Sequence, residues 1–526
     1  MFRTIKNLFR LIGIMRTLAR YDAVFPLEKL DLPDWAVKGL SLLAGRASKK
    51  FADHRPGERL ALALQEQGPS FIKFGQSLST RSDLIGEDVA QDLASLRDRL
   101  PPFSASEARK TIESEFEQPL DALFETFDDE PVAAASIAQV HFATTLAGEE
   151  VAVKILRPGI EEAFRRDLDL FYWMAEVIET LQPGFRRLRP VEVVRTFADS
   201  VDLEMDLRLE AAAASELSDA FEHDPDFGVP QIDWNLTQRR VMTIERIRGI
   251  SIADTAAIEE AGLDKDHLAS NLLVAFLKQV FRDGFFHADL HPGNLFTDEA
   301  GRILAVDFGI MGRLDRQTRQ FVAELLLAFV TGDWKRAAEI HFEAGYVPRN
   351  KSVDVFAQAC RSIGEPLMGR AANEISIGRL LAQLFQITET FAMRTQPQLL
   401  LLQKTLVVVE GVCRDLSPET NFFEASRPFL TEWVRENLGP EARVRDAVVE
   451  TAAAARRIPH ILDQAEQATE FLSAAGLAFK NDQDQNGLSP LQQRQQTGFG
   501  ARRRGMPSMY VIILLVAVIA VLLFRG

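Results

Sequence analysis

The chain has 526 residues, which is enough for more than one domain and for a large hydrophobic core. Its net charge of −15 argues against nucleic acid as the main partner, because a phosphate-binding face needs concentrated Lys and Arg. Only two cysteines are present, Cys360 and Cys413, and they lie far apart. This excludes a disulfide scaffold or a structural zinc site and fits a reducing compartment.

The first segment, residues 1–21, is basic and amphipathic. Apolar residues recur at helical spacing, acids are absent, and the cations are Arg3, Lys6, Arg10, Arg16 and Arg20. Such helices lie at anionic membrane surfaces, and the basic ends of an otherwise acidic chain point the same way. Two alternatives stay open: an ordinary helix packed on the domain, and a cleavable organelle presequence.

Residues 57–67 form a further amphipathic run that stops at Gly68-Pro69, and a new helix is expected with Ser70 as its N-cap. On that helix Lys73 and Gln76 are three residues apart and share one face. They place one cation and one amide in apolar surroundings. Taken alone, the two side chains fit ordinary polar surface residues slightly better than a functional site.

The pattern changes at Pro131, after which a small-residue loop precedes two strands. The loop consists of Ala133, Ala134, Ala135, Ser136, Ile137, Ala138 and Gln139. A turn at 147–150 then leads to a β-branched run, which predicts a hairpin whose second strand carries Lys154. Protein kinases cover the nucleotide phosphates with a Gly-rich loop and pair them with a V-A-x-K lysine. An alanine loop is stiffer and should approach phosphates differently, and a surface lysine on an edge strand is the alternative for Lys154.

Residues 192–214 are expected to form one helix carrying Glu204, Asp206 and Glu210. Asp206 and Glu210 are four residues apart and share a face, where like charges repel unless cations or a metal intervene. A kinase-type site needs a glutamate that aims the strand lysine, and the four alanines after Glu210 allow close packing. A solvated acidic face is the alternative.

Two elements lead into the central stretch of the chain. Residues 241–247 read as a strand that ends at Arg248-Gly249, of the kind that links two lobes in kinase folds. Residues 268–283 then form a strongly amphipathic helix.

The central stretch, residues 285–309, contains three groups of a phosphoryl-transfer site. Asp289 is placed to accept or orient a proton, and Asn294, five residues on, to ligate a metal. Asp307 ends an apolar run and is placed to ligate a metal that bridges nucleotide phosphates. The kinase pattern H-R-D-L-x-x-x-N followed by D-F-G has the same offset between Asp and Asn. The alternative is a polar turn followed by a buried strand.

No A-P-E sequence follows Gly309, and helical sequence begins by about Gln317. A substrate-docking activation loop has no room here, which argues against protein phosphorylation. Helical periodicity continues at 315–331, 334–344, 375–394, 398–413 and 440–475. Residues 481–505 resemble a flexible tether. Residues 506–524 are uncharged and apolar after three arginines, which predicts a single membrane anchor with the large N-terminal portion cytoplasmic; a buried terminal helix or re-entrant segment is the alternative.

In this order, the motifs resemble those of the UbiB-type atypical kinase-like family, proteins tied to ubiquinone biosynthesis. They are K-x-G-Q at 73–76, the Ala-rich loop at 133–135, V-A-V-K at 151–154, E-x-D at 204–206, then H-A-D-x-H-P-G-N and D-F-G. The resemblance covers roughly residues 60–420. The chain departs at Ala138, where relatives often carry Gly, at Leu290, often Pro, and in showing one clear span where some bacterial relatives have two.

The resemblance implies an α+β, two-lobed protein-kinase-like fold with a helical N-terminal extension over the nucleotide site, a helical C-terminal region and a C-terminal transmembrane helix. The expected parts are a basic segment (1–56), the helical extension (57–130), the N-lobe (131–249), the C-lobe (250–480), the tether (481–505) and the anchor (506–524).

The cofactors are expected to be ATP and Mg²⁺. Lys154 would hold phosphates and pair with Glu210, Asn294 and Asp307 would bind Mg²⁺, and Asp289 would orient the attacking water or hydroxyl. The loop 133–139 would cover the phosphates. An inhibitory gate would consist of Lys73, Gln76, Glu204 and Asp206.

The expected function is a Mg²⁺-dependent ATPase, or a kinase for a small or lipid-like molecule, that supports ubiquinone synthesis at the bacterial inner membrane. Expected partners are membrane lipids, quinone precursors and quinone-synthesis enzymes, and not nucleic acid. A nucleotide-sensing scaffold and a genuine protein kinase remain as alternatives.

Overall fold

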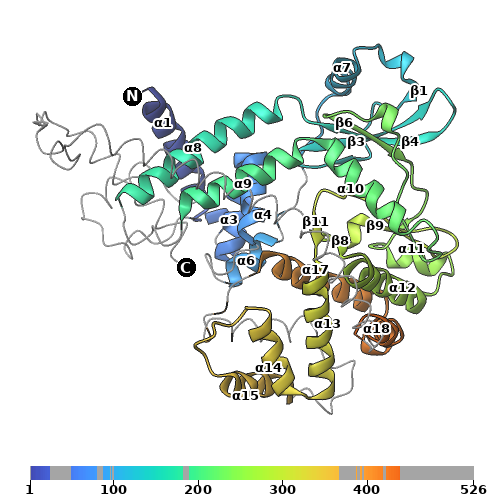
Figure 1. Ribbon diagram of the computed structural model, residues 1–526. Coiled ribbons are helices and arrows are strands. Elements are labelled where there is room, and N and C mark those ends of the chain that lie inside the picture. Colours follow the sequence, from blue (N-terminus) through green and yellow to red (C-terminus); the bar gives the residue numbers. More distant parts are fainter. Residues whose placement is uncertain are drawn as a thin grey trace, which may run out of the picture. The chain divides into compact units, whose positions relative to one another are not determined.

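The computed structural model describes residues 2–23, 49–51, 53–79, 87–94, 96, 100–181, 189–365, 387, 391, 393, 396–418 and 422–438. The chain divides into two compact units, and the second, Arg427–Met506, is described only in the last part of one helix. Everything that follows concerns the first unit, whose described elements are drawn in Figure 1.

The N-terminal helices form a layer around a shared apolar core. They are α1 (Phe2–Arg20), α3 (Pro56–Gln67), α4 (Pro69–Ser79) and α6 (Glu87–Ala94), after which α7 (Ala105–Phe116) follows; short 3-10 turns lie at Lys49–Phe51 and Leu120–Ala122. Phe74 of α4 stacks on Phe171 with ring centroids 4.8 Å apart, and Leu11 of α1 is buried in the same cluster. Ser70 is not the N-cap of α4, since the helix begins at Pro69, where a proline is well tolerated.

The basic residues of α1 bind acidic residues of this chain. Arg3 Nε donates to Asp169 Oδ1 at 2.7 Å, and Arg10 pairs with the buried Asp167. Arg20 pairs with Glu66 of α3. In this structure α1 is therefore a helix packed on the domain, the first of the two alternatives to a membrane-surface helix.

A five-stranded antiparallel sheet follows. Its strands are β1 (Phe124–Phe127), β2 (Ala133–Ala134), β3 (Ala138–Thr145), β4 (Glu150–Leu156) and β6 (Val241–Glu245). The order is β1-β3-β4-β6, with β2 paired to β3. The expected hairpin is present as β3 and β4, joined by a turn in which Gly148 takes a φ of 83° that favours glycine. The strand expected at 241–247 is β6.

The helix expected over 192–214 is wrong in one respect, because it is broken in two. After α8 (Ile160–Leu181) come α9 (Pro190–Glu204) and α10 (Leu207–Ala220). Asp206 lies between them in an extended conformation, and its side chain accepts a hydrogen bond from the Arg208 backbone N–H. This N-cap starts a new helix and ends the preceding one.

The C-terminal part contains two small sheets and the remaining helices. One sheet has the order β5-β10-β9-β7 (Phe227–Gly228, Ile303–Ala305, Leu295–Thr297, Ile250–Ser251), and β8 (Phe285–His287) pairs with β11 (Met311–Arg313). The helices are α11 (Thr255–Glu260), α12 (Lys265–Leu277), the π-helix η6 (Lys278–Asp283), α13 (Arg316–Thr331), α14 (Trp334–Glu343), α15 (Val353–Gly364), α17 (Pro397–Leu416) and α18 (Phe422–Leu438), with 3-10 turns at Trp234–Leu236 and Pro292–Asn294.

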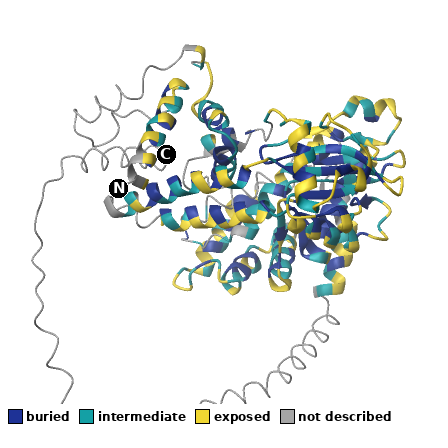
Figure 2. Cartoon of the chain, turned by 90° about the horizontal axis from the view of Figure 1, so that it is seen from above, coloured by how far each residue is buried: buried dark blue, intermediate teal, exposed yellow. Residues whose placement is uncertain are grey.

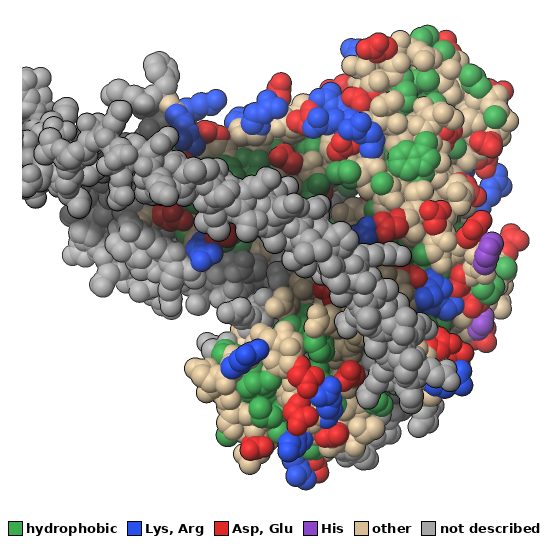
Figure 3. All heavy atoms as spheres, in the orientation of Figure 1, with side chains coloured by type: hydrophobic (Ala, Val, Ile, Leu, Met, Phe, Trp, Pro, Cys, Tyr) green, Lys and Arg blue, Asp and Glu red, His purple; other side chains and the backbone are tan. Residues whose placement is uncertain are grey.

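Burial follows the amphipathic patterns in most helices. The expectation of a strongly amphipathic helix over 268–283 is wrong, because α12 and η6 are buried on nearly all sides between Leu268 and Phe281. In Figure 2 the buried residues gather on the strands and on the inner faces of the helices, while exposed residues follow the outer faces and the loops. On the described part of the face in Figure 3, acidic and basic side chains are intermingled.

Among the described residues, no helix has both the length and the apolar character needed to cross a membrane. The anchor expected at 506–524 and the tether at 481–505 lie outside the described residues, as do the segment 440–475 and most of 375–394.

Candidate functional site

Lys154 is the centre of the site. Its Nζ lies 2.6 Å from Glu210 Oε1 and 3.0 Å from Asp307 Oδ1. These three residues come from β4, from α10 and from the segment after β10, so three separate sequence motifs meet at one ammonium group.

The alternation of β4 explains the direction of the lysine. Val151, Val153 and Ile155 point into the core beneath the sheet, so Lys154 points to the opposite face. Helix α10 covers that face with Ala211 and Ala214, both fully buried. Small residues at these positions allow the helix to come close enough for Glu210 to reach the lysine.

Two carboxylates share the single ammonium. Burial opposes the charge of Lys154, but Asp307 and Glu210 together raise its pKa above the ordinary value, so the group stays charged. The Lys154 ammonium lowers the pKa of Asp307, while burial raises the pKa of Glu210. The Asp307 side chain is 52% exposed, against 9% for Glu210, so Asp307 remains accessible to a ligand.

Asp307 has a left-handed backbone conformation, with a φ of 64°. Few side chains adopt this region without strain, and Asp and Asn are among those that tolerate it best. Strained residues concentrate at functional sites, where the surrounding structure holds them. Here β10 ends two residues earlier, and the turn directs the carboxylate to Lys154.

His287 joins the loop of Asp289 to the chain before Asp307. Its Nδ1 accepts the Asp289 backbone N–H at 3.1 Å, so Nε2 carries the proton and donates to the Val306 carbonyl at 3.1 Å. The side chain is fully buried, and burial lowers the pKa of His287, which keeps it neutral. Gln279 of the π-helix η6 fixes the strand by accepting the His287 backbone N–H at 2.9 Å. The sequence interpretation gave neither residue a role, although His287 opens the H-A-D motif.

Asn294 lies against the same segment. Its Nδ2 donates to the Asp289 carbonyl at 3.1 Å, and its backbone carbonyl accepts the Val306 N–H at 2.9 Å. The amide nitrogen is thereby used, and Oδ1 remains as a possible metal ligand. Asp289 itself lies between two basic side chains, with His291 Nε2 4.0 Å from Oδ2 and Lys404 Nζ 3.9 Å from Oδ1.

The donor set fits Mg²⁺ held together with a nucleotide. Among the described residues, no group of three or more His, Cys, Asp or Glu side chains is placed to hold a metal alone. Mg²⁺ commonly takes only one or two protein oxygens and completes its octahedron with phosphates and water. Asp307 and the Asn294 amide oxygen match that requirement.

Only half of the Ala-rich loop is accessible. Ala133, Ala134 and Ala135 are exposed or half-buried, whereas the residues from Ser136 to Gln139 are buried. The Ala135 carbonyl accepts from Arg157 Nη2 at 2.8 Å, which fixes the turn. The loop therefore exposes chiefly its first three residues.

Gln139 was expected among the phosphate-loop residues, but its side chain has another role. Gln139 Oε1 accepts from the Phe103 N–H at 3.0 Å, and Nε2 donates to the Phe103 carbonyl at 3.3 Å. The amide holds the segment before α7 in place, so a contribution to nucleotide binding is left to the backbone.

The gate residues are brought together only in part. Lys73 Nζ lies 2.9 Å from Glu204 Oε2, and Lys73 also contributes, after Lys154, to lowering the pKa of Asp307. Gln76 is half-buried on the same helix. Asp206 instead pairs with Arg208 Nη2 at 2.6 Å, so the expectation that it shares a face with Glu210 is wrong. The cause is the break between α9 and α10.

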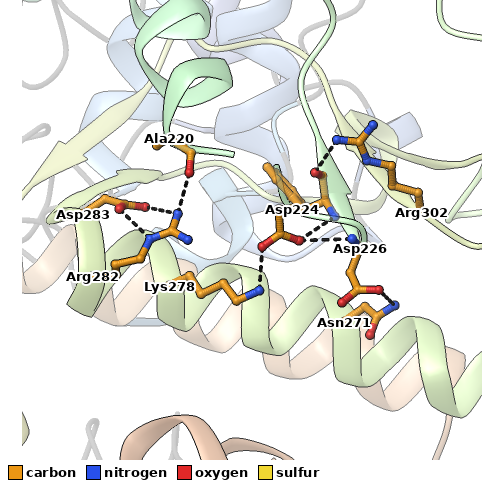
Figure 4. A network of polar contacts seen from close by, with 9 residues as sticks. Ala220, Asp224, Asp226, Asn271, Lys278, Arg282, Asp283 and Arg302 are labelled. Carbon is orange, nitrogen blue, oxygen red and sulfur yellow. Dashed lines mark hydrogen bonds and ion pairs between the residues drawn. The ribbon is translucent and has the colours of Figure 1, made fainter. Parts of the chain in front are cut away.

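The far end of α10 is bound to the elements that precede the central stretch (Figure 4). Arg282 Nη2 donates to the Ala220 carbonyl at 2.8 Å, and Lys278 Nζ donates to Asp224 Oδ2 at 2.5 Å. Asn271 reaches Asp226 at 3.3 Å. This network joins the end of α10 and the segment after it to α12 and η6, the elements that precede the loop of Asp289.

Comparisons with known proteins cover most of the chain. Residues 95–341 match the ABC1 atypical kinase-like domain, and residues 360–421 match the UbiB helical domain. Three similar proteins are all named "Probable protein kinase UbiB". That of Marinobacter nauticus is 43% identical, covering 84% of this chain and 81% of its own. Those of Azotobacter vinelandii and Pseudomonas entomophila are each 40% identical, and each match covers 88% of this chain and 87% of the relative.

Among solved structures, the Rv3197–erythromycin complex from Mycobacterium tuberculosis is 25% identical with a TM-score of 0.45, and the match covers 61% of this chain and 84% of that one. The family rests on the relatives and on the two matching domains. With a kinase-like domain, a UbiB helical domain and relatives about 40% identical over most of its length, this chain belongs to the UbiB family of atypical kinase-like proteins.

Proposed function

We propose that this protein is a membrane-anchored, Mg²⁺-dependent ATP-binding enzyme that supports ubiquinone biosynthesis. It hydrolyses ATP or transfers the terminal phosphate to a small or lipid-like acceptor. The observation that carries the proposal is the placement of Lys154 within 3.0 Å of both Glu210 and Asp307. A lysine aimed by a buried glutamate and a carboxylate placed for metal are the parts that phosphoryl transfer needs.

Each site residue has a role that follows from its position. Lys154 binds the inner phosphates, and Glu210 holds its ammonium in place. Asp307 and Asn294 would hold Mg²⁺, which would supply neutralisation of the phosphate charge. Asp289 orients the attacking hydroxyl or water and accepts its proton, and neutral His287 keeps the loop of Asp289 aligned with Asp307.

Protein phosphorylation is the second candidate, because the relatives carry the name "Probable protein kinase UbiB". The segment that follows Gly309 argues against protein phosphorylation. Strand β11 already occupies Met311–Arg313, and α13 begins at Arg316. No long segment remains there to bind a substrate peptide, which favours water or a small acceptor.

The place of catalysis in quinone synthesis is tested in a deletion strain of the source organism, complemented with single variants. Asp289→Asn keeps the shape of the loop but removes the proton acceptor, so ubiquinone should fall to the level of the uncomplemented strain. The exposed Asp354 of α15 provides a matched control, and Asp354→Asn should restore ubiquinone fully. Ubiquinone and its precursors are quantified in lipid extracts.

A nucleotide-sensing scaffold predicts a different result in the same strain. It would need ATP binding but no proton transfer, so Asp289→Asn would restore ubiquinone while Lys154→Ala would not. That outcome would contradict the enzymatic proposal.

We place the membrane anchor at residues 506–524, because this segment is uncharged and apolar. Helix α1 is the weaker candidate for membrane contact, since its cations bind acids of this chain. A chain that ends at residue 505 should leave the membrane fraction, whereas the full chain should resist both high salt and alkaline carbonate. Fractionation of expressing cells followed by immunoblotting measures this. A shortened chain that remains carbonate-resistant in the membrane would refute the anchor.

A further inference from the structure

Helix α17 reaches the loop of Asp289 from the C-terminal helical region. The Thr405 hydroxyl is fully buried and lies 3.1 Å from the Ala288 carbonyl, 117 positions away in sequence. The neighbouring Lys404 places its Nζ 3.9 Å from Asp289 Oδ1. Two consecutive residues of α17 therefore contact two consecutive residues of the candidate catalytic loop.

The position of Lys404 is set by a helix that buries one of its faces. Val409 and Val412 are buried on α17, and Cys413 Sγ donates to the Ala269 carbonyl of α12 at 3.4 Å. Together with the Thr405 contact, these interactions fix both the rotation of α17 and its distance from the loop. Lys404 is thus held at Asp289 by its backbone, although its side chain is 37% exposed.

The contact with Asp289 does not close off the Lys404 ammonium, whose side chain is partly exposed. At 3.9 Å the two groups attract each other but lie beyond the range of a direct hydrogen bond. The three N–H donors of the ammonium are therefore not satisfied by Asp289. A further negatively charged acceptor can approach the exposed side of the Lys404 ammonium, and the terminal phosphate of ATP is such a group.

We propose that Lys404 binds the terminal phosphate of ATP, so that the helical region completes the active site. This inference rests on the proposed function, because it takes Asp289 as the residue beside the phosphate that is transferred. Lys154 is already engaged by Glu210 and Asp307 on the side of the inner phosphates. Lys404 supplies a second cation, on the side of Asp289, where charge accumulates on the terminal phosphate.

The test compares Mg·ADP with Mg·ATP, because only ATP carries the terminal phosphate. Dissociation constants of both nucleotides are measured by isothermal titration calorimetry on the purified full chain in lipid nanodiscs. Lys404→Met should leave ADP binding within about twofold and weaken ATP binding about tenfold, the size of one lost charge-assisted hydrogen bond. Lys404→Arg keeps the cation and should recover most of the loss.

Lys265→Met serves as a control, since Lys265 of α12 pairs with Glu259, which is 74% exposed, and belongs to no motif of the site. It should change neither constant. Turnover adds a second readout, in which Lys404→Met lowers kcat and raises KM for ATP.

Two results would overturn the inference. If Lys404→Met weakens ADP and ATP binding equally, the residue acts through the fold and not through the terminal phosphate. If it changes neither, Lys404 does not touch the nucleotide. A wild-type chain that binds neither nucleotide would instead overturn the proposed function and this inference with it, so the two failures are distinguishable.

Discussion

Replacing Lys154 with methionine is expected to lower ATP turnover by at least about 100-fold and to destabilise the protein by about 3 kcal/mol. The catalytic loss follows from removing the cation that binds the phosphates. The loss of stability follows because Glu210 is only 9% exposed and would be left buried without its partner. Turnover is measured by phosphate release, and stability by thermal unfolding of the purified chain.

The stability loss should depend on pH in a defined direction. Burial already raises the pKa of Glu210, and removing Lys154 withdraws the charge that opposes this shift. At high pH the variant must bury a charged carboxylate, whereas as the pH falls that carboxylate, with its raised pKa, takes up a proton and no longer needs the lysine. The difference in Tm between wild type and Lys154→Met should therefore shrink as the pH falls from 8 to 5.

Lys265 offers the matched control. Its Nζ lies 2.7 Å from Glu259 Oε2, a distance close to that of the Lys154 pair, but Glu259 is 74% exposed. Lys265→Met should cost far less stability than Lys154→Met and leave turnover unchanged, because water screens an exposed ion pair. Similar losses in both variants would show that the Lys154 pair has no special role.

Local patterns predicted the hairpin and the direction of Lys154, because both depend on near neighbours in sequence. The β-branched run 151–155 alternates between core and site, and that alternation alone puts the lysine on the face away from the core. The five-residue offset between Asp289 and Asn294 likewise predicted that the two residues lie close together, since one short turn contains both.

Side-chain partners could not be predicted where a nearby competitor exists. Asp206 was expected to act with Glu204 and Glu210. Instead it forms an ion pair with Arg208, two residues away, and its carboxylate caps the start of α10, where the expected helix is broken. No Gly or Pro marks the break in the sequence, and buried apolar residues lie on both sides of it at Met205 and Leu207.

Long-range partners leave no signal in a single sequence. The basic stripe of α1 suits an anionic membrane and the acids of α8 equally well, and only the fold shows that Arg3 meets Asp169. Lys404 stands in an unremarkable helical segment 115 positions after Asp289, so nothing in its neighbourhood marks it as part of the site.

Replacing Asp307 with asparagine is the second change expected to have a large effect on turnover. Asparagine is nearly the same size and also tolerates the left-handed conformation, so Asp307→Asn changes the charge without straining the turn. Glu210 remains to hold Lys154 in place. Because the lost carboxylate is the only negatively charged metal ligand proposed for the site, turnover should fall about 1000-fold.

The most direct measurement is ATP hydrolysis by the purified full chain over a range of Mg²⁺ concentrations, for wild type, Asp307→Asn and the control Asp354→Asn. The site described here predicts Mg²⁺-dependent turnover in the wild type and in Asp354→Asn. Asp307→Asn should lose that turnover at every Mg²⁺ concentration while keeping the wild-type Tm within a few degrees. Turnover by Asp307→Asn at the wild-type rate and with the wild-type Mg²⁺ dependence would contradict the assignment of the site.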